Sequence, residues 1–236
     1  MIEVIQGADL AQRADIVDQM YRMRARVFND ILKWDVSVEN GRERDRFDEL
    51  DPLYIVSICE KTGVLQGSVR LLPTTGPNML SEVFFELFKP GEEVVSPLVW
   101  ESSRFSIDPD LNTNRSNSSL NSVTIELLCG MVEIGLYSGI SYIVSVYDQR
   151  MTRVFRRAKC DAEIIGGPRR FGKVPTFAGL FDITKARWEA IASTGAVDGS
   201  VLAPSQRHLS GLVSPLERAN VEAPQACVGE LENQDA

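Results

Sequence analysis

The sequence predicts an α/β (α+β) fold, in which a mixed, twisted sheet is flanked by helices. Ile16, Met20, Met23 and Val27 recur at spacings of four, three and four, which is typical of an amphipathic helix. Later in the chain, short β-rich runs alternate with two further helical patterns. The order helix, hairpin, strand, helix, strand, helix, strand is packed most simply as one mixed sheet covered by helices.

Local patterns predict the individual elements. Two β-rich runs on either side of Lys61-Thr62-Gly63 predict a hairpin. The charged stretch 30–52 contains Gly41 and is predicted to be a loop or a mobile lid. The full set is a helix at 16–28, hairpin strands at 54–60 and 64–72, a strand at 97–107, an Asn/Ser loop at 112–121, a helix from about 120, a strand at 140–146, a basic helix at 150–159, a strand at 177–183 and a short helix ending near 191.

The length of 236 residues fits one domain with a substantial core. We expect this domain to span residues 1–193. From residue 194 onward Pro, Ser, Gly, Ala and acidic residues dominate, so residues 194–236 are predicted to form a loosely held tail.

Composition excludes several functions. With 25 Lys+Arg against 33 Asp+Glu the formal net charge is -8, which argues against a nucleic-acid-binding protein. His208 is the single histidine, so a histidine-based triad or multi-histidine metal site is not expected. The four cysteines have no C-x-x-C spacing and are read as reduced thiols. No signal-like or membrane-spanning apolar run occurs, so we expect a cytoplasmic chain.

The predicted strand 97–107 contains charges among apolar neighbours. Charges in such a strand cost several kcal/mol unless they are paired or used, so Glu101 and Arg104 need a partner or a ligand. One interpretation is a buried structural ion pair. The other is a cleft in which Glu101 accepts a proton and Arg104 holds a carboxylate. If the strand is regular, Ser103 between them points to the opposite face.

A second group of residues combines aromatic and charged side chains. Arg24 and Phe28 lie four residues apart on the first predicted helix, and Trp34, Asp45 and Asp48 follow in the charged stretch. Aromatic faces with carboxylates suit a small cation that carries a π-surface. A solvated loop anchored by one tryptophan is the alternative. Arg70 adds an isolated charge on the second hairpin strand.

The segment 150–173 is locally basic in an acidic chain. It holds eight basic residues against two acids, and Arg150, Arg153 and Arg157 share one helical face. An acidic protein or a phosphate-bearing cofactor would be attracted to such a face, although a solvated helix face explains it equally well. The phosphate-loop, dinucleotide-binding and H-E-x-x-H zinc motifs are missing from the sequence.

As a set, these residues resemble one known family. The signature residues of the acyl-homoserine-lactone synthases, the bacterial autoinducer synthases of quorum sensing, are matched in order by Arg24, Phe28, Trp34, Asp45, Asp48, Arg70, Phe84, Glu101 and Arg104. The resemblance covers residues 1 to about 185. It implies a single-domain fold similar to the GNAT-type N-acyltransferases.

The resemblance also implies a reaction with two substrates. S-adenosylmethionine supplies an amine, and a thioester on acyl carrier protein, or on coenzyme A in some members, supplies the acyl group. N-acylation is followed by lactonisation, which releases methylthioadenosine. No metal and no bound cofactor are expected, because S-adenosylmethionine is a co-substrate. Its sulfonium, adenine, ammonium and carboxylate match the aromatic, acidic and arginine side chains above.

Roles follow from this chemistry as hypotheses. Glu101, directly or through a water, takes the ammonium proton. Asp45 and Asp48 fix the ammonium or the loop over it, and Phe28 and Trp34 wall the pocket. Arg24 and Arg104 pair with carboxylates, either that of the substrate or those of Asp45 and Asp48. Backbone N–H groups from Ser102 to Phe105 stabilise the oxyanion. The expected catalytic residues are Glu101, Ser103 and Arg104, and the expected substrate-binding residues are Arg24, Phe28, Trp34, Asp45, Asp48, Arg70, Phe84, Phe105 and Tyr142.

The acyl donor is addressed by two further expectations. Because acyl carrier proteins are acidic, Arg150, Arg153 and Arg157 are the expected docking residues, with Arg169, Arg170 and Lys173 as a possible extension. Family members with 3-oxo products often carry Thr before the strand core that is Ile143-Val144-Ser145 here. Tyr142 stands there in this chain, which favours an unsubstituted or 3-hydroxy acyl chain.

Two other functions were weighed. A GNAT acetyltransferase that uses acetyl-coenzyme A should contain an R/Q-x-x-G-x-G/A loop, and the sequence has none. A non-catalytic relative that binds an acidic partner should have lost the base or the arginines. Glu101, Asp45 and Arg104 are all present.

Overall fold

The computed structural model describes residues 1–112, 120–171 and 174–212. Within these residues a seven-stranded mixed sheet has the order β1-β4-β5-β6-β7-β9-β8. Its strands are β1 (Ile2–Ile5), β4 (Leu53–Ile58), β5 (Leu65–Pro73), β6 (Val99–Ile107), β7 (Tyr142–Asp148), β9 (Val174–Asp182) and β8 (Glu163–Phe171). Neighbouring strands are antiparallel except for β6 and β7, which are parallel. The predicted class, a mixed sheet flanked by helices, is confirmed.

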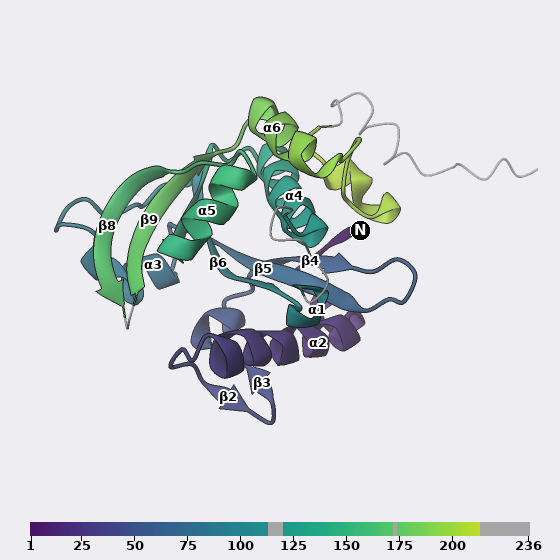
Figure 1. The fold of residues 1–236 in the computed structure, drawn as a ribbon, viewed down its shortest axis with the longest axis horizontal. Helices are drawn as coiled ribbons and strands as arrows, with labels where there is room; N and C mark the ends of the chain where they lie inside the picture. Colours follow the sequence, from purple (N-terminus) through teal and green to yellow (C-terminus); the bar gives the residue numbers. More distant parts are fainter. Residues whose placement is uncertain (113–119, 172–173, 213–236) are drawn as a thin grey trace, which may run out of the picture.

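Helices cover both faces of this sheet (Figure 1). They are α1 (Asp9–Gln12), α2 (Ala14–Arg24), α3 (Met79–Glu82), α4 (Ser122–Ser138), α5 (Gln149–Arg157) and α6 (Lys185–Gly195), with short helical segments η1 (Ala25–Ile31, a π-helix), η2 (Arg46–Glu49), η3 (Phe85–Leu87), η4 (Pro109–Asn112) and η5 (Pro204–Leu209). Among the described residues, no helix combines the length and the apolarity that crossing a bilayer demands.

The hydrophobic core consists of one large cluster of buried side chains and several smaller ones. On one face, α4, α5 and α6 pack against the sheet through apolar residues such as Leu127, Ile143 and Phe155. On the other face, α2 packs on β4 and β5 through Ile16, Met20 and Met23. These three residues belong to the apolar face that the helix period predicts. Arg24 and Arg70, two of the candidate site residues, lie on this second face, where both bind Asp48.

The two parallel strands β6 and β7 separate part of the way along their length, and we call this point the β6–β7 fork. β6 and β7 pair from Val99–Tyr142 to Ser102–Ser145, and no further, although both strands continue. β7 stays paired with β9 up to Asp148. β7 stays with β9, and β6 separates from β7 after the pair Ser102–Ser145. Glu101 lies one residue before this separation.

Two strands of the seven-stranded sheet were not predicted from the sequence, and the predicted loop at 30–52 is largely ordered. Strands β1 and β8 lie at the two edges of the sheet. The 30–52 stretch contains a hairpin of β2 (Val38–Glu39) and β3 (Arg42–Glu43) and then η2. Asn40 and Gly41 link the hairpin strands with positive φ values of 51° and 74°, as a two-residue turn requires. The prediction of a mobile lid is therefore wrong for this segment, which buries Glu43, Phe47 and Asp48.

Residues 196–212 pack onto the domain and extend the folded unit past the boundary predicted at residue 193. Ile2 of the edge strand β1 exchanges backbone hydrogen bonds with Val201 and Ala203. The side-chain amide of Gln206 accepts from the Val4 N–H at 2.7 Å and donates to its carbonyl at 2.8 Å. We call residues 200–210 the C-terminal strap. The expectation of a loose tail at 213–236 lies outside the described residues.

The strap is held by one buried carboxylate. Glu133 of α4 is fully buried and accepts four hydrogen bonds within the described structure. They come from the Trp188 indole at 3.0 Å, the Val201 N–H at 3.0 Å, and the hydroxyls of Ser200 and Ser210 at 2.6 and 2.7 Å. One side chain thus joins α4, α6 and both ends of the strap.

Candidate functional site

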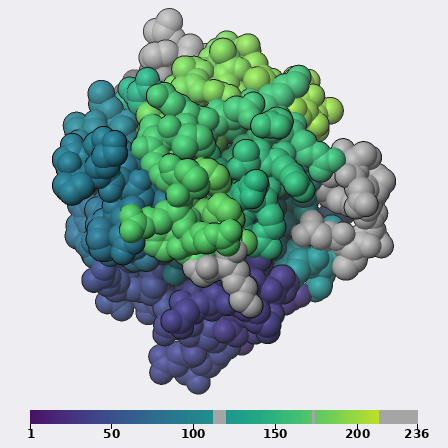
Figure 2. Space-filling view, turned by 60° about the vertical axis from the view of Figure 1, so that its left-hand side comes forward, coloured from purple at the N-terminus to yellow at the C-terminus, as the bar shows by residue number. Residues whose placement is uncertain are grey.

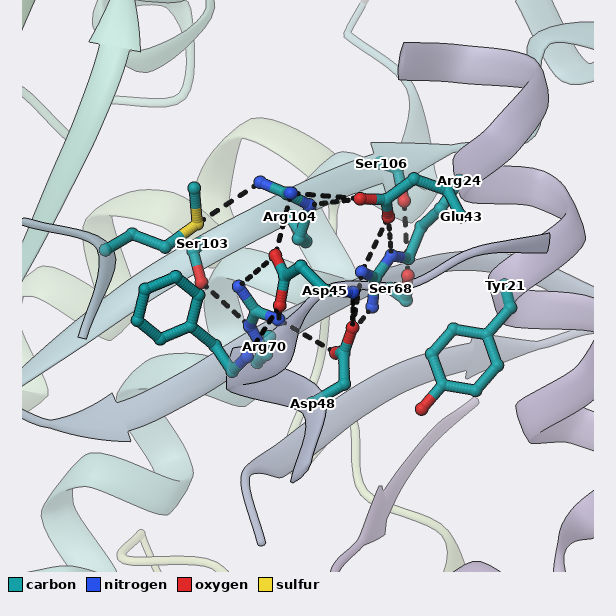
Figure 3. A network of polar contacts seen from close by, with 12 residues as sticks. Tyr21, Arg24, Glu43, Asp45, Asp48, Ser68, Arg70, Ser103, Arg104 and Ser106 are labelled. Carbon is teal, nitrogen blue, oxygen red and sulfur yellow. Dashed lines mark hydrogen bonds and ion pairs between the residues drawn. The ribbon is translucent and has the colours of Figure 1, made fainter. Parts of the chain in front are cut away.

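Three arginines and three carboxylates meet beneath α2 and form a buried ion cluster (Figure 3). Its members are Arg24 at the end of α2, Glu43 of β3, Asp45 and Asp48 at η2, Arg70 of β5 and Arg104 of β6. Each of these residues except Glu43 was selected from the sequence. Their formal charges cancel, and each ion is paired, which is the condition for burying charges.

Arg24 lies at the centre of the cluster with no exposed surface. Its guanidinium donates to both oxygens of Asp48 at 2.9 Å and to Oε2 of Glu43 at 2.6 Å. Such a two-pronged pair fixes both partners in position. Arg24 is therefore fully engaged inside the protein, and a direct contact with a substrate carboxylate would require that it leave these partners.

Arg70 joins the cluster to the sheet. It donates to Asp45 at 2.5 and 3.1 Å, to Asp48 at 2.8 Å and to the Ser103 hydroxyl at 3.1 Å. Asp48 also accepts from the hydroxyl of Tyr54 on β4 at 2.7 Å. These contacts tie η2 to β4 and β5, so that the segment carrying Asp45 and Asp48 is anchored to the sheet.

Arg104 reaches the same face because β6 bulges. β5 pairs Ser68 with Ser106 but Arg70 with Ser103, so β6 contains one extra residue there. Arg104 takes the left-handed conformation with φ 55°. Its guanidinium then contacts Glu43 at 2.9 Å and Asp45 at 2.7 Å. A regular strand would place Glu101 and Arg104, three residues apart, on opposite faces.

The bulge also corrects the expectation for Ser103. Glu101 and Ser103 are two residues apart and precede the bulge, so both face the ion cluster. The contact of the Ser103 hydroxyl with Arg70 is made on that face. The prediction that Ser103 points to the opposite face from Glu101 and Arg104 is therefore wrong. It depended on a regular strand, and the strand is irregular at Arg104.

The ion pairs of the cluster strongly shift the pKa values of Asp48 and Arg24. Burial by itself would raise the pKa of Asp48, but the guanidiniums of Arg24 and Arg70 hold that pKa well below its usual range. Burial would lower the pKa of Arg24, and Asp48 and Glu43 raise it instead. Asp48 and Arg24 therefore stay charged at neutral pH, and the paired groups of the cluster act as a fixed frame.

Glu101 differs from these carboxylates because it forms no ion pair with any residue that the structure describes. Its carboxylate accepts from the backbone N–H of Met79 at 3.0 Å and of Leu80 at 2.6 Å. Only 2% of the residue is exposed. Burial raises the pKa of Glu101 to about 7, against the lowering effect of those two N–H groups and of Arg70 and Arg104. A carboxylate poised near neutrality is suited to proton transfer.

An aromatic pair lies beside the cluster. The rings of Phe28 and Trp34 are stacked with centroids 5.1 Å apart and planes at 15°. Arg104 lies 5.5 Å from the centroid of Phe28. Phe28 is buried, whereas Trp34 remains 42% exposed. The structure thus brings the predicted aromatic wall next to the predicted arginine.

The other predicted substrate-binding residues are more widely placed. Phe84 meets Phe171 edge-on, with centroids 5.0 Å apart, above the sheet face that contains Val144 and Ala178. Tyr142 is half-exposed at the start of β7, two residues before Val144, the partner of Glu101 in the β6–β7 register. The side chain of Phe105 packs against the large core with α4, away from the ion cluster.

The basic helix is α5, and its arginines are exposed. The green part of the chain that contains this helix covers a broad area of the surface in Figure 2. Arg150 is bound to Asp148, which caps the same helix and accepts at 2.6 and 2.8 Å. Arg153 and Arg157 lie further along the helix, and Arg169 and Arg170 lie on β8. Arg169 pairs with Glu86 at 3.0 Å. Lys173 lies outside the described residues.

Glu43 is the cluster member that the sequence analysis missed. It bridges Arg24 and Arg104, with 2.6 Å to one and 2.9 Å to the other. Asn40-Gly41 was the available signal, because Asn-Gly is a strong hairpin turn. A hairpin there would have marked Glu43 as a strand residue that could face inward.

The fold and this site first define a class. A mixed sheet with a fork between two parallel strands, next to a buried carboxylate of pKa about 7, is suited to acyl transfer to an amine. A putative N-acetyltransferase from Lactobacillus plantarum shares this fold with a TM-score of 0.50 and 16% identity, over 78% of this chain and 99% of that one. The molecule has the fold of the N-acyltransferases.

Sequence comparison identifies the family. The autoinducer synthase model matches residues 8–191. An acyl-homoserine-lactone synthase of Agrobacterium fabrum is 37% identical over 177 residues, 75% of this chain and 83% of the relative. One from Rhizobium etli is 41% identical over 169 residues, 71% and 77% of the two chains. The chain belongs to the autoinducer synthase family, and it is an enzyme of quorum-sensing signal synthesis.

Solved structures agree with this assignment. BjaI, a CoA-dependent acyl-homoserine lactone synthase solved with SAM and isopentyl-CoA, superimposes with a TM-score of 0.76 at 24% identity, covering 86% of this chain and 92% of that one. At this identity the likeness concerns the fold. TofI, solved in a ternary complex with an inhibitor and MTA, has a TM-score of 0.67 at 28% identity, covering 84% of this chain and all of that one.

Proposed function

We propose that this chain transfers an acyl group from a thioester donor to the amine of S-adenosylmethionine, with Glu101 as the base. The observation that carries the proposal is the position of Glu101. It is a buried carboxylate with a pKa of about 7, one residue before the β6–β7 fork and on the same face as the ion cluster. S-adenosylmethionine enters as a substrate; of the structural neighbours, BjaI was solved with SAM and TofI with MTA.

The first step moves two protons and one acyl group. Glu101 takes a proton from the ammonium, and the free amine attacks the thioester carbonyl carbon. The carbon–sulfur bond breaks, and the thiolate leaves with the second amine proton. Backbone N–H groups of residues 103–105, where β6 has left β7, are the proposed donors to the tetrahedral oxyanion.

The second step closes the lactone. A carboxylate oxygen of the methionine moiety attacks the carbon next to the sulfonium, and the carbon–sulfur bond breaks with its electrons on sulfur. Methylthioadenosine leaves as a neutral molecule, so that this step needs no protein nucleophile. Such a displacement depends mainly on holding the carboxylate in line with the reacting carbon.

The substrate contacts follow from the exposure of the cluster. Asp45 and Arg104 keep 18% and 9% of their side chains exposed, whereas Arg24, Glu43, Asp48 and Arg70 keep none. We therefore assign the substrate ammonium to Asp45 and its carboxylate to Arg104. The four fully buried residues form the frame that positions these two. Trp34 and Phe28 wall the adenosyl group.

The proposed acyl donor is acyl carrier protein, which would dock on the basic α5. Arg150, Arg153 and Arg157, which are exposed on this helix, are assigned the contacts. The guanidinium of Arg150 also binds Asp148. An acyl-CoA donor is the alternative, and its phosphates would be attracted by the same charges.

A product assay tests the function. Purified protein is incubated with S-adenosylmethionine and panels of acyl carrier protein and coenzyme A thioesters, and extracts are examined by mass spectrometry. We expect equal amounts of an acyl-homoserine lactone and methylthioadenosine. Glu101→Gln should reduce turnover by about 100-fold or more, while the exposed Glu189→Gln on α6 should not. Near-normal turnover of folded Glu101→Gln would remove Glu101 as the base.

A further inference from the structure

A turn at residues 74–78 links the hairpin strand β5 to α3. Asn78 is 1% exposed and begins α3. Its side-chain oxygen accepts from the Ser81 N–H at 2.9 Å, and its amide donates to the Gly76 carbonyl at 2.8 Å. Thr74, also buried, is tied to the start of β6 by a hydrogen bond of 2.8 Å to the Val99 carbonyl. The turn is therefore fixed at both ends, and the proposed mechanism has not used its polar residues.

The first turn of α3, which begins at Asn78, supplies the donors that touch Glu101. Met79 donates its N–H to Oε2, and Leu80 donates to Oε1. Within the described structure, Arg70 and Arg104 also act on Glu101 by charge, but their own hydrogen bonds go elsewhere. Arg70 is bound to Asp45 and Asp48, and Arg104 to Glu43, Asp45 and the Met79 sulfur. The backbone of the turn is thus in direct contact with the carboxylate.

Backbone N–H donors favour the ionised form of a carboxyl group, because they can only donate. They act against burial, which favours the neutral form. Asn78 occupies the extended conformation, with φ -152° and ψ 164°, and by capping Ser81 it fixes the direction of the Met79 and Leu80 N–H groups. The position of this one side chain consequently bears on the charge of Glu101.

We propose that the turn from Asn78 to Leu80 holds Glu101 as the anion that accepts the substrate proton, and that Asn78 is the positioning residue that fixes this turn. This inference rests on the base role proposed for Glu101. It assigns the control of that base to backbone groups outside the ion cluster. The proton transfer itself is unchanged: an N–H bond of the ammonium breaks and an O–H bond forms on Glu101.

Met79→Pro tests the proposal by deleting one donor. Proline is favoured at the first position of a helix, and the extended Asn78 before it is compatible with proline. The variant also loses the thioether, so Met79→Leu is the matched control that keeps the N–H. The measurement is the pH dependence of kcat/KM for S-adenosylmethionine, which reports ionisations of the free enzyme.

We expect the acid limb of Met79→Pro to move up by about one pH unit relative to Met79→Leu, as loss of a charge-assisted hydrogen bond implies. With the limb starting near pH 7, the rate at pH 7 should fall roughly fivefold and recover at high pH. Identical midpoints in the two variants would overturn the proposal. An acid limb that persists in Glu101→Gln would instead contradict the base role, so the two failures are distinguishable.

Substitutions of Asn78 provide a second measurement. It tests the control of Glu101 by the turn even if Met79→Pro does not fold. Asn78→Ala loses the cap and should shift the acid limb upward, whereas Asn78→Ser retains a capping oxygen and should restore the midpoint. A purely structural role for Asn78 would lower stability or the active fraction and leave the midpoint in place. Wild-type midpoints in both folded variants would refute the role of Asn78.

Discussion

Arg104 lies beside Glu43, with the guanidinium Nε 3.0 Å from Oε1, because its backbone adopts φ 55° at a bulge in β6. This contact joins the strand that carries Glu101 to the hairpin of β2 and β3. A left-handed conformation costs a non-glycine residue of the order of 1 kcal/mol, so the ion pair has to outweigh it. Glu43 also accepts a hydrogen bond from Arg24, so one carboxylate links the end of α2 to β6.

Removing Glu43 should destabilise the protein severely. Glu43→Ala leaves Arg24 and Arg104 with unpaired donors in a buried site, and breaking such a pair typically costs about 3–5 kcal/mol. Urea denaturation followed by circular dichroism measures the loss. Glu39→Ala, at an exposed position on the same hairpin, should change the free energy of unfolding by less than about 0.5 kcal/mol. A similar effect of both variants would contradict the role of Glu43.

The ionisation of Glu101 should appear in the pH dependence of stability. Its pKa is raised on folding from 4.5 to about 7, so the native state binds more protons than the unfolded state between these values. Glu101 therefore lowers stability as pH rises from about 4.5 to 7, by about 3 kcal/mol. The free energy of unfolding of Glu101→Gln should lack this component when measured at pH 5 and 7.5. Parallel pH dependence in wild type and variant would argue against the raised pKa.

Replacing Trp34 should weaken the binding of S-adenosylmethionine more than it lowers the stability of the fold. The ring stacks on Phe28 and remains half-exposed, so Trp34→Ala removes one wall of the proposed pocket. We expect binding of S-adenosylmethionine, measured by calorimetry, to weaken roughly tenfold. Trp34→Phe should recover most of the affinity. Ile31→Ala, at an exposed neighbouring position, is the control, and an equal loss there would indicate a general disturbance of the segment.

Charge reversal on α5 should separate the two substrates. Arg153→Glu combined with Arg157→Glu should raise the KM for acyl carrier protein by at least about tenfold at low salt and leave the KM for S-adenosylmethionine unchanged. Arg207→Glu, on the surface of η5, serves as the control. Equal increases in both KM values would exclude α5 as the docking helix, and an effect on acyl-CoA alone would identify coenzyme A as the donor.

Glu133 should be required to hold the C-terminal strap against the domain. Glu133→Ala leaves the Trp188 indole, two serine hydroxyls and the Val201 N–H without their acceptor, which predicts a loss of at least about 3 kcal/mol. Hydrogen exchange at Ile2 and Val4 should accelerate, since the strap accepts their N–H groups. Glu189→Ala on the exposed face of α6 should do neither. Unchanged protection of β1 would show that the strap is held without Glu133.

The sequence by itself determined the elements with a strong period and the residue types of the site. Ile16, Met20 and Met23 face the core because the helical period places them there, and Arg24 follows on the same helix. Single charged residues within apolar stretches of the sequence identified Arg70, Glu101 and Arg104, because a charge buried in a strand needs a partner in any fold. The family resemblance, carried by these residues, is confirmed. The edge strands β1 and β8 lacked a distinctive pattern and were missed.

Only the tertiary structure decided which residue meets which. Whether Ser103 and Arg104 share a face depends on one bulge, which arises from the register between β5 and β6 and from a backbone angle that no side-chain pattern encodes. The pairing of Glu43 with two arginines needs a hairpin, a helix and a strand brought together from three parts of the chain. Glu101 has its raised pKa for the same reason, because burial, Arg70 and the turn at Met79 act on it through space.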